Sequence, residues 1–182
     1  MRNFKVILLA GILTILSSGC FKDETLSCLT VYNKSGEDLW LESNIISAYP
    51  HSKIYVYSPH QIERYGISEY SDSTLCFPLK DEYWACIAQT KWYNGTTIWP
   101  LSDCIYNKEE AYVRIYRTDS CGEKTLVRTW YYVDKDKDGH ELFSESCTER
   151  LFATYEFGDF SVTYLFSILP EDITGQTDSL AQ

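Results

Sequence analysis

Residues 111–133, AYVRIYRTDSCGEKTLVRTWYYV, carry the clearest structural signal in the chain. Apolar and polar residues alternate over 111–117, and β-branched and aromatic residues dominate 125–133. A period of two with such residues is typical of strands that bury one face. The polar stretch Asp119–Glu123 contains Cys121-Gly122 and predicts a turn between the two segments. This region therefore predicts two strands separated by a turn.

Shorter strand signals recur on both sides of this region. We expect further strands over 26–32, 38–41, 53–57, 74–77, 83–93, 96–99, 140–145, 151–157 and 160–169. The turn cluster Asn33–Gly36 predicts a first hairpin, and Gly158-Asp159 predicts a final one. A short helical turn is expected within 61–66, but no long segment keeps a helical period. The chain is therefore predicted to be all-β, as an antiparallel β-sandwich, Ig-like or similar, or as a partly open barrel.

Composition narrows the classes of partner. The chain has 182 residues, a length that suits one domain with a sizeable core. It contains 26 Asp and Glu residues against 16 Lys and Arg residues, which gives a formal net charge of −10. So acidic a protein repels phosphate groups, and we expect no binding to nucleic acid.

The first twenty residues, MRNFKVILLAGILTILSSGC, differ from the rest of the chain. Arg2 and Lys5 give a positive start, a run of mostly apolar residues follows, and small residues precede Cys20. This order is typical of an export signal. The apolar run is too short to cross a bilayer, which takes roughly 20 residues.

Leu16-Ser17-Ser18-Gly19-Cys20 resembles the lipobox of bacterial lipoproteins. In that family the signal peptide is cleaved before the cysteine, which carries acyl chains such as palmitate and anchors the protein to a membrane. The following Lys22-Asp23-Glu24 is similar to the export motif of surface lipoproteins in one group of Gram-negative anaerobes. The resemblance implies a signal peptide over 1–19, a lipidated Cys20, and a place in the outer membrane at the cell surface. A plain secretory signal and an ordinary charged linker are the alternatives.

The remaining chain is expected to form one β domain over residues 28–169. Residues 20–27 would be its lipid-anchored tether, and residues 170–182 a flexible C-terminal tail, since they contain turn residues and few apolar ones. The seven residues after Cys20 reach about 25 Å at full extension. A tether this short favours a protein that is docked or complex-associated near the membrane.

Cysteine usage agrees with export. The chain has seven cysteines, and lipidation would take Cys20. An even number in an exported domain predicts disulfides, here two or more, although their pairing is left open. Buried free thiols are the alternative. The residues concerned are Cys28, Cys76, Cys86, Cys104, Cys121 and Cys147.

The most specific motif is DKDKDGHELFSE at 134–145, which matches the calcium-loop pattern D-x-D-x-D-G-x5-E. Glu141 occupies a position that is normally aliphatic, and the flanks predict strands instead of helices. A solvated loop in which Lys135 and Lys137 offset the aspartates is the alternative. Calcium prefers hard oxygen ligands, and these would come from Asp134, Asp136, Asp138, the carbonyl of His140, and Glu145.

Aromatic residues near the Asn94-Gly95 turn form a second candidate site. Trp92, Tyr93, Trp99 and Tyr106 lie around this turn and the loop after it. Exposed aromatic rings can stack on sugar rings, so these residues are candidates for glycan contact. Packing in the core or at its rim is the alternative.

Signatures of catalysis are absent from the sequence. It has no HExxH or GxSxG motif and no glycine-rich phosphate loop. The leading hypothesis is a non-enzymatic, lipid-anchored envelope protein that binds a glycan or another envelope protein, or serves a structural role. One alternative is a small exported hydrolase of glycan or peptidoglycan that uses paired carboxylates such as Asp81-Glu82 or Glu109-Glu110. Another is a structural lipoprotein stabilised by calcium.

Overall fold

The computed structural model describes residues 24–48, 54–57, 62–65, 75–93, 100–154 and 160–174. The predicted signal peptide and Cys20 lie outside these residues, as does the strand predicted at 96–99. Within the described part of the chain, no helix is long and apolar enough to cross a bilayer.

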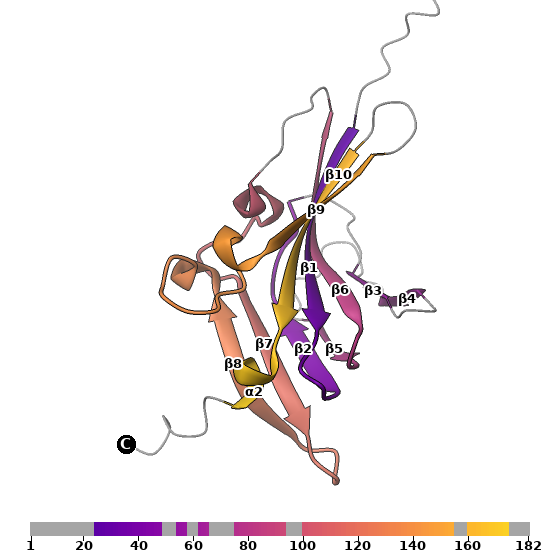
Figure 1. Ribbon diagram of the computed structural model, residues 1–182, viewed down its shortest axis with the longest axis vertical. Coiled ribbons are helices and arrows are strands. Elements are labelled where there is room, and N and C mark those ends of the chain that lie inside the picture. Colours follow the sequence, from indigo (N-terminus) through magenta and orange to yellow (C-terminus); the bar gives the residue numbers. More distant parts are fainter. Residues whose placement is uncertain are drawn as a thin grey trace, which may run out of the picture.

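Two β-sheets form the body of the protein (Figure 1). The larger sheet has six strands in the order β4-β3-β6-β1-β10-β9. These are β1 (Glu24–Asn33), β3 (Ile54–Tyr57), β4 (Ile62–Tyr65), β6 (Trp84–Tyr93), β9 (Glu149–Thr154) and β10 (Phe160–Ile168). The smaller sheet has the order β5-β2-β7-β8. Its strands are β2 (Leu39–Ser43), β5 (Leu75–Leu79), β7 (Tyr112–Thr118) and β8 (Lys124–Tyr131).

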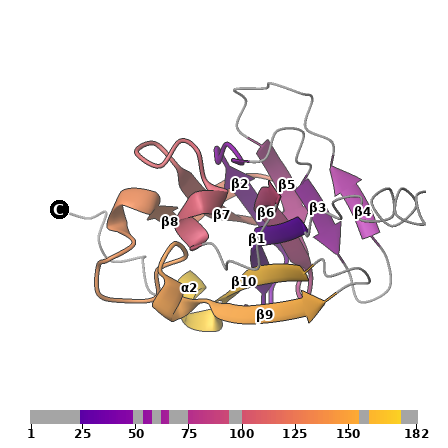
Figure 2. The ribbon, with the colours of Figure 1, turned by 90° about the horizontal axis from the view of Figure 1, so that it is seen from above.

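Short helical elements fill the connections. They are the 3-10 turns η1 (Leu101–Cys104), η2 (Tyr132–Asp134) and η3 (Glu145–Cys147), and the helix α2 (Pro170–Thr174). Seen from above, β9 and β10 lie on one side of the molecule and β7 and β8 on the other (Figure 2). The sheets do not close into a barrel, so the predicted all-β sandwich is confirmed.

The core lies between the two sheets and follows the alternation of the strands. Leu29 and Val31 of β1 face Leu41, Val113 and other apolar residues of the smaller sheet, and all of these are fully buried. Burying one such aliphatic side chain stabilises the fold by about 1.5–3 kcal/mol. Trp130 of β8 meets Phe166 of β10 edge to face, with ring centroids 5.4 Å apart. This pair joins the two sheets directly.

Two sequence-predicted local features are confirmed. Strands β7 and β8 pair around the turn predicted at Asp119–Glu123. The Asp119 side chain accepts hydrogen bonds from the backbone amides of Cys121 and Glu123, both at 2.8 Å. Gly122 adopts φ +85°, a conformation that glycine reaches without strain. The predicted final hairpin is formed by β9 and β10.

The predicted first hairpin is wrong, because β1 and β2 belong to different sheets. The buried side chain of Asn33 explains the change of direction. Its Nδ2 donates to the carbonyls of Glu37 and Leu79 at 2.8 and 2.9 Å, and its Oδ1 accepts from the Ser35 hydroxyl at 2.7 Å. These hydrogen bonds fix the turn through which the chain passes from β1 of the larger sheet to β2 of the smaller one. Strand β1 pairs instead with β6 in antiparallel and with β10 in parallel orientation.

Three further expectations are corrected. Residues 140–145 form turns and not a strand, since the consecutive residues Leu142 and Phe143 are both buried. Residues 62–65 form β4 where a helical turn was expected, because they pair with β3. Residues 24–27, predicted as tether, already belong to β1.

The predicted flexible tail is wrong for its first five residues. Pro170–Thr174 form α2, and Asp172 and Ile173 are buried. Ile173 joins the hydrophobic core. The helix is thus part of the domain, and residues 175–182 lie outside the described part.

Candidate functional site

The outer face of the four-stranded sheet carries large aromatic and charged side chains. The inward residues of these strands, such as Leu41, Val113 and Ile115, are fully buried. Because side chains alternate along a strand, the residues between them point outward. The cross-strand register places Trp40 beside Tyr116 and Glu42 beside Arg114. We call this surface the aromatic face; it consists of Trp40, Glu42, Tyr112, Arg114, Tyr116, Leu126, Thr129 and Tyr131.

Glu42 of β2 is the centre of the aromatic face. Its Oε1 accepts hydrogen bonds from the Tyr112 hydroxyl and from Nη1 of Arg114, both at 3.1 Å. Its Oε2 accepts a hydrogen bond from the Tyr116 hydroxyl at 2.9 Å. The Glu42 side chain is only 18% exposed. One carboxylate therefore fixes three neighbouring side chains, all supplied by β7.

Cations stack on two rings of this face. The Arg114 guanidinium lies 4.1 Å from the centroid of the Tyr112 ring, and Nζ of Lys124 lies 3.4 Å from that of Trp40. The Tyr131 ring meets Tyr112 edge to face at 6.3 Å. Each cation–π contact contributes about 0.5–1 kcal/mol at an exposed site. The side chains of the face are therefore held in place before any partner arrives.

The environment of this face raises the pKa of both Arg114 and Tyr116. Burial alone would lower the pKa of Arg114, but its hydrogen bonds to Tyr131 and Tyr116 outweigh burial and raise it above its ordinary value. Burial and the bond to Glu42 raise the pKa of Tyr116. At neutral pH the guanidinium is charged and the Tyr116 hydroxyl is a neutral donor. This arrangement can hold a partner, but it offers no proton that moves readily.

The edge of the aromatic face is apolar and open. Leu126 is 51% exposed and Tyr131 is 41% exposed. Tyr, Trp and Arg are the residue types enriched where proteins bind one another, and they also dominate the energetics of such interfaces. The face thus combines fixed polar groups at its centre with exposed apolar area at its margin.

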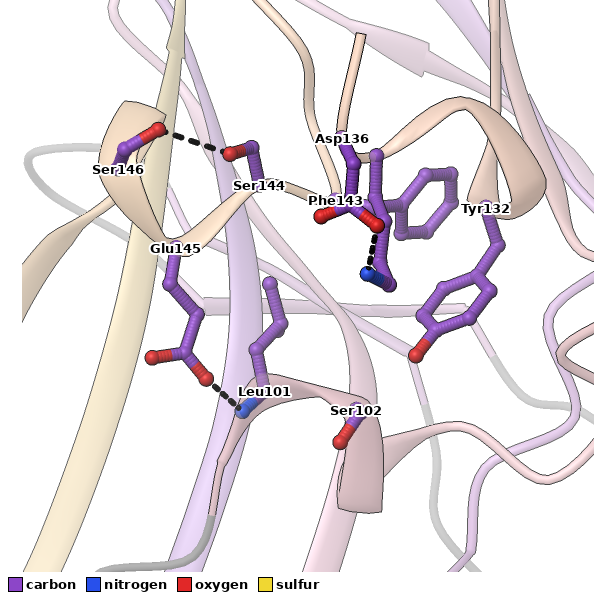
Figure 3. Close-up of a pocket in the computed structure, with 9 residues that line it drawn as sticks. Leu101, Ser102, Tyr132, Asp136, Phe143, Ser144, Glu145 and Ser146 are labelled. Atoms are coloured by element: carbon purple, nitrogen blue, oxygen red, sulfur yellow. Dashed lines mark hydrogen bonds and ion pairs between the residues drawn. The ribbon is translucent and has the colours of Figure 1, made fainter.

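A hollow of about 340 Å³ lies beside the loop that follows β8. Figure 3 shows the Glu145 carboxylate turned toward the backbone nitrogen of Leu101, which donates to it at 2.9 Å. The Ser144 and Ser146 hydroxyls bond each other at 2.8 Å. The hollow is lined by Leu101, Ser102, Tyr132, Lys135, Asp136, Phe143, Ser144, Glu145 and Ser146. Much of the polar part of this lining is therefore already hydrogen-bonded within the protein.

Both carboxylates of this hollow are paired with basic side chains. Asp136 is bound by Lys135, and Glu145 by Arg150. The carboxylate pairs named from the sequence also lie elsewhere, since Asp81-Glu82 and Glu109-Glu110 are turn residues. The hydrolase alternative stays a prediction.

The groups predicted to bind calcium are held apart by other partners. The Asp134 carboxylate accepts from Nζ of Lys137 at 2.8 Å. The His140 carbonyl accepts from Nη2 of Arg128 at 2.9 Å and from Nε1 of Trp130 at 3.0 Å. The contact between Lys137 and Asp134 is of the kind expected for the alternative to calcium, a solvated loop in which lysines offset the aspartates.

The remaining predicted calcium ligands are likewise not gathered. Asp136 pairs with Lys135, Asp138 is exposed, and Glu145 is held by Leu101 and Arg150. Within the described ranges, no three His, Cys, Asp or Glu side chains are grouped so that they could hold a metal ion. The structure therefore gives the calcium prediction no support.

A buried ionic network nearby was missed by sequence reasoning. The Asp172 side chain is fully buried, and it binds Nη1 of Arg128 at 2.5 Å and Nδ1 of His140 at 2.9 Å. It also accepts from the backbone amide of Leu169 at 2.8 Å. The His140 ring stacks on Phe166 with centroids 4.4 Å apart. The network fastens α2 to β8 and β10, and a pairing across 44 residues has no local sequence signal.

The aromatic residues predicted to contact glycan are only partly described. Tyr106 is 78% exposed, just after η1. The backbones of Trp92 and Tyr93 end β6, and Trp99 lies outside the described residues. Glycan contact at these four residues stays a prediction.

The six cysteines are free thiols, so no predicted disulfide is present in the structure. Cys76, Cys121 and Cys147 lie in different elements, on the edge strand β5, in the turn between β7 and β8, and in η3, respectively. Cys104 is buried in the core cluster. Cys28 and Cys86, both buried, lie on the neighbouring strands β1 and β6.

Comparison with known proteins adds no assignment. No protein-family model matches the chain, and no curated protein is similar to it in sequence.

Proposed function

We propose that the protein is a non-enzymatic, lipid-anchored accessory protein of the bacterial outer membrane, exposed at the cell surface. In this proposal it binds another envelope protein through the aromatic face. The observation that carries the proposal is Glu42, which fixes Tyr112, Arg114 and Tyr116 on the outer face of the four-stranded sheet, beside the exposed side chains of Leu126 and Tyr131. Side chains that are ordered in advance lose less entropy on binding.

The position of β1 supports a site of action close to the membrane. Only residues 21–23 separate Cys20 from the start of β1 at Glu24. Three residues span about 10 Å at most. An acylated Cys20 would therefore hold this end of the six-stranded sheet against the bilayer, and a partner in the same membrane would be within reach.

The orientation of the sheets supports contact with a neighbour instead of with lipid. Thr25, near the start of β1, pairs with Trp92 at the end of β6 and with Phe160 at the start of β10. These three strand ends would face the bilayer together. The four-stranded sheet extends toward the opposite end of the molecule (Figure 1). The aromatic face would thus stand clear of the headgroups.

The anchor is tested with Cys20→Ala in the full chain. We expect the unmodified protein to fractionate with membranes and to incorporate labelled palmitate, and the variant to lose the label. A native chain without acyl groups, recovered from the cytoplasm, would overturn the proposed anchoring.

The aromatic face is tested by a photo-crosslinking amino acid introduced at Leu126 in living cells. Position Phe152, exposed on β9 of the other sheet, is the matched control. We expect one defined envelope protein to be crosslinked from position 126 and not from 152, and the crosslink to disappear with Glu42→Ala. Equal crosslinking from both positions, or none from 126, contradicts the proposal. If instead a purified glycan binds the protein, and Glu42→Ala abolishes this binding, the ligand of the aromatic face is a saccharide and not a protein.

A further inference from the structure

Two thiols of the six-stranded sheet lie face to face across neighbouring strands. In the antiparallel pairing of β1 with β6, Cys28 lies opposite Gln89 and Thr30 lies opposite Cys86. A register shift between Leu29 and Thr30 marks a β-bulge on β6. Because residues two apart point the same way, Cys28, Thr30 and Cys86 share one face of the sheet. Cys86 is therefore the diagonal neighbour of Cys28.

The two side chains are neighbours in a buried part of the sheet. The pKa of each thiol depends on the other, and only 9% of Cys28 and 4% of Cys86 is exposed. Sγ of Cys28 lies 3.7 Å from Oγ1 of Thr163, and Nε2 of Gln89 donates to Sγ of Cys86 at 3.2 Å. Polar groups thus surround both sulfur atoms.

The contact makes the two thiols chemically unequal. The hydrogen bond from Cys86 lowers the pKa of Cys28. The same bond, together with burial, raises the pKa of Cys86. Because a thiolate is the attacking species in disulfide exchange, Cys28 is suited to react first and Cys86 to react second.

Pairing of Cys28 with Cys104 or with Cys76 is disfavoured by position. Cys104 lies in the core cluster, on the face of β1 to which Leu29 and Val31 point, whereas Cys28 points to the opposite face. Cys76 lies 3.5 Å from Nζ of Lys124 on the other sheet.

We propose that Cys28 and Cys86 are oxidised to a disulfide that joins β1 to β6 in the middle of the six-stranded sheet. The inference goes beyond the proposed function, since it concerns a covalent bond within the domain and not its partner.

The reaction is thiol–disulfide exchange with a disulfide-bearing oxidant while the two strands assemble. The Cys28 thiolate attacks one sulfur of the oxidant, which breaks the oxidant's S–S bond, forms a mixed disulfide and releases one oxidant thiolate. That thiolate accepts the proton of Cys86, and the Cys86 thiolate attacks the Cys28 sulfur, forms the new S–S bond and releases the second oxidant thiolate, which takes up a proton from solvent. Two protein thiols are oxidised and one oxidant disulfide is reduced.

The test uses the full chain purified in detergent, reduced, unfolded and refolded with oxidised and reduced glutathione. Free thiols are then alkylated, and the protein is cleaved by trypsin without reduction. Cleavage after Lys and Arg places each of the six cysteines on a peptide of its own, with Cys28 in 23–34 and Cys86 in 81–91. We expect a linked pair of these two peptides, and near-complete loss of alkylation at both cysteines.

Variants make the assignment specific. Cys104→Ser should keep the linked pair, while Cys86→Ser should lose it and return Cys28 to the alkylated form. The unmodified chain decides alone if a variant does not fold. Alkylation of both cysteines in the refolded chain, or linkage of Cys28 to another peptide, overturns the inference. Because glutathione supplies the oxidant in vitro, the result does not depend on where the protein resides or what it binds.

Discussion

The region around Cys28 and Cys86 on the outer face of the six-stranded sheet differs from the aromatic face in the size and exposure of its side chains, although Trp84 at the start of β6 is 43% exposed on that same side. On the six-stranded sheet, Cys28, Thr30 and Cys86 are small and almost fully covered. On the four-stranded sheet, Tyr131 is exposed and Trp40 is half-buried. Small side chains let neighbouring groups approach closely, whereas large rings supply contact area for a partner. We interpret the first face as serving cohesion of the fold and the second as serving recognition.

The largest effect is expected where both sheets depend on one side chain. Trp130→Ala should lower the free energy of unfolding by about 3–5 kcal/mol, since it removes a fully buried ring and leaves a cavity. Denaturant titration measures the loss. The adjacent Tyr131→Ala is the matched control, because its side chain points to the opposite, exposed face, and it should cost far less. Equal losses would break the distinction between the inner and outer faces.

The second largest effect is expected from reduction of the proposed disulfide in the six-stranded sheet. If the Cys28–Cys86 disulfide forms, reduction should lower the free energy of unfolding by about 2–4 kcal/mol, a typical value for one disulfide. Melting with and without a reductant measures this, and Cys86→Ser should remove the difference between the two conditions. A sensitivity to reductant that persists in Cys86→Ser would assign it to other cysteines.

A smaller effect on stability, but a large one on binding, is expected from the aromatic face. Glu42→Ala removes three hydrogen bonds, and should lower the free energy of unfolding by about 1–3 kcal/mol. Crosslinking from position 126 should disappear. Glu42→Gln, which keeps the shape and part of the bonding, should lose less of both. Full crosslinking in Glu42→Ala would show that the arrangement fixed by Glu42 is not needed for binding of the partner.

High pH should weaken the domain through a tyrosine of the six-stranded sheet. Burial raises the pKa of Tyr164 to about 12. Its pKa is lower in the unfolded chain, so the unfolded state releases its proton first as the pH rises. Stability should therefore be constant below the ordinary tyrosine pKa and fall between that value and about 12. Tyr164→Phe should reduce the decrease in melting temperature over this range, while Tyr106→Phe, at an exposed position, should not.

The smallest effect is expected from calcium. The His140 carbonyl and the Asp134 carboxylate already have partners within the protein. Addition of calcium or of a chelator should leave the melting temperature unchanged, because only a ligand that binds the folded state raises it. A rise with calcium that Asp136→Asn and Glu145→Gln abolish would restore the calcium loop.

Patterns within a few residues predicted part of this structure correctly. Alternation over 111–117 and the Cys121-Gly122 turn identified β7 and β8, because these signals depend on neighbouring residues only. The strand predicted at 140–145 was wrong. There, the backbone carbonyl of His140 serves Arg128 and Trp130 instead of a neighbouring strand. Tertiary contacts overrode the local pattern.

The aromatic face and the Asp172 network were beyond local patterns. Glu42 is 70 residues from Tyr112, and Asp172 is 32 residues from His140. A single sequence carries no signal for such pairs. The pattern of alternation in 112–116 did place Tyr112, Arg114 and Tyr116 on one side of a strand, and this was the available clue.

The parallel pairing of β1 with β10 has a consequence for how the protein assembles. The first and last strands lie side by side inside the larger sheet, with Leu29 next to Tyr164. Contacts between such distant segments close slowly, because a long intervening chain must be ordered first. The six-stranded sheet cannot be completed before β10 has been synthesised. Strands β1 and β6 are thus made long before the last strand that completes their sheet.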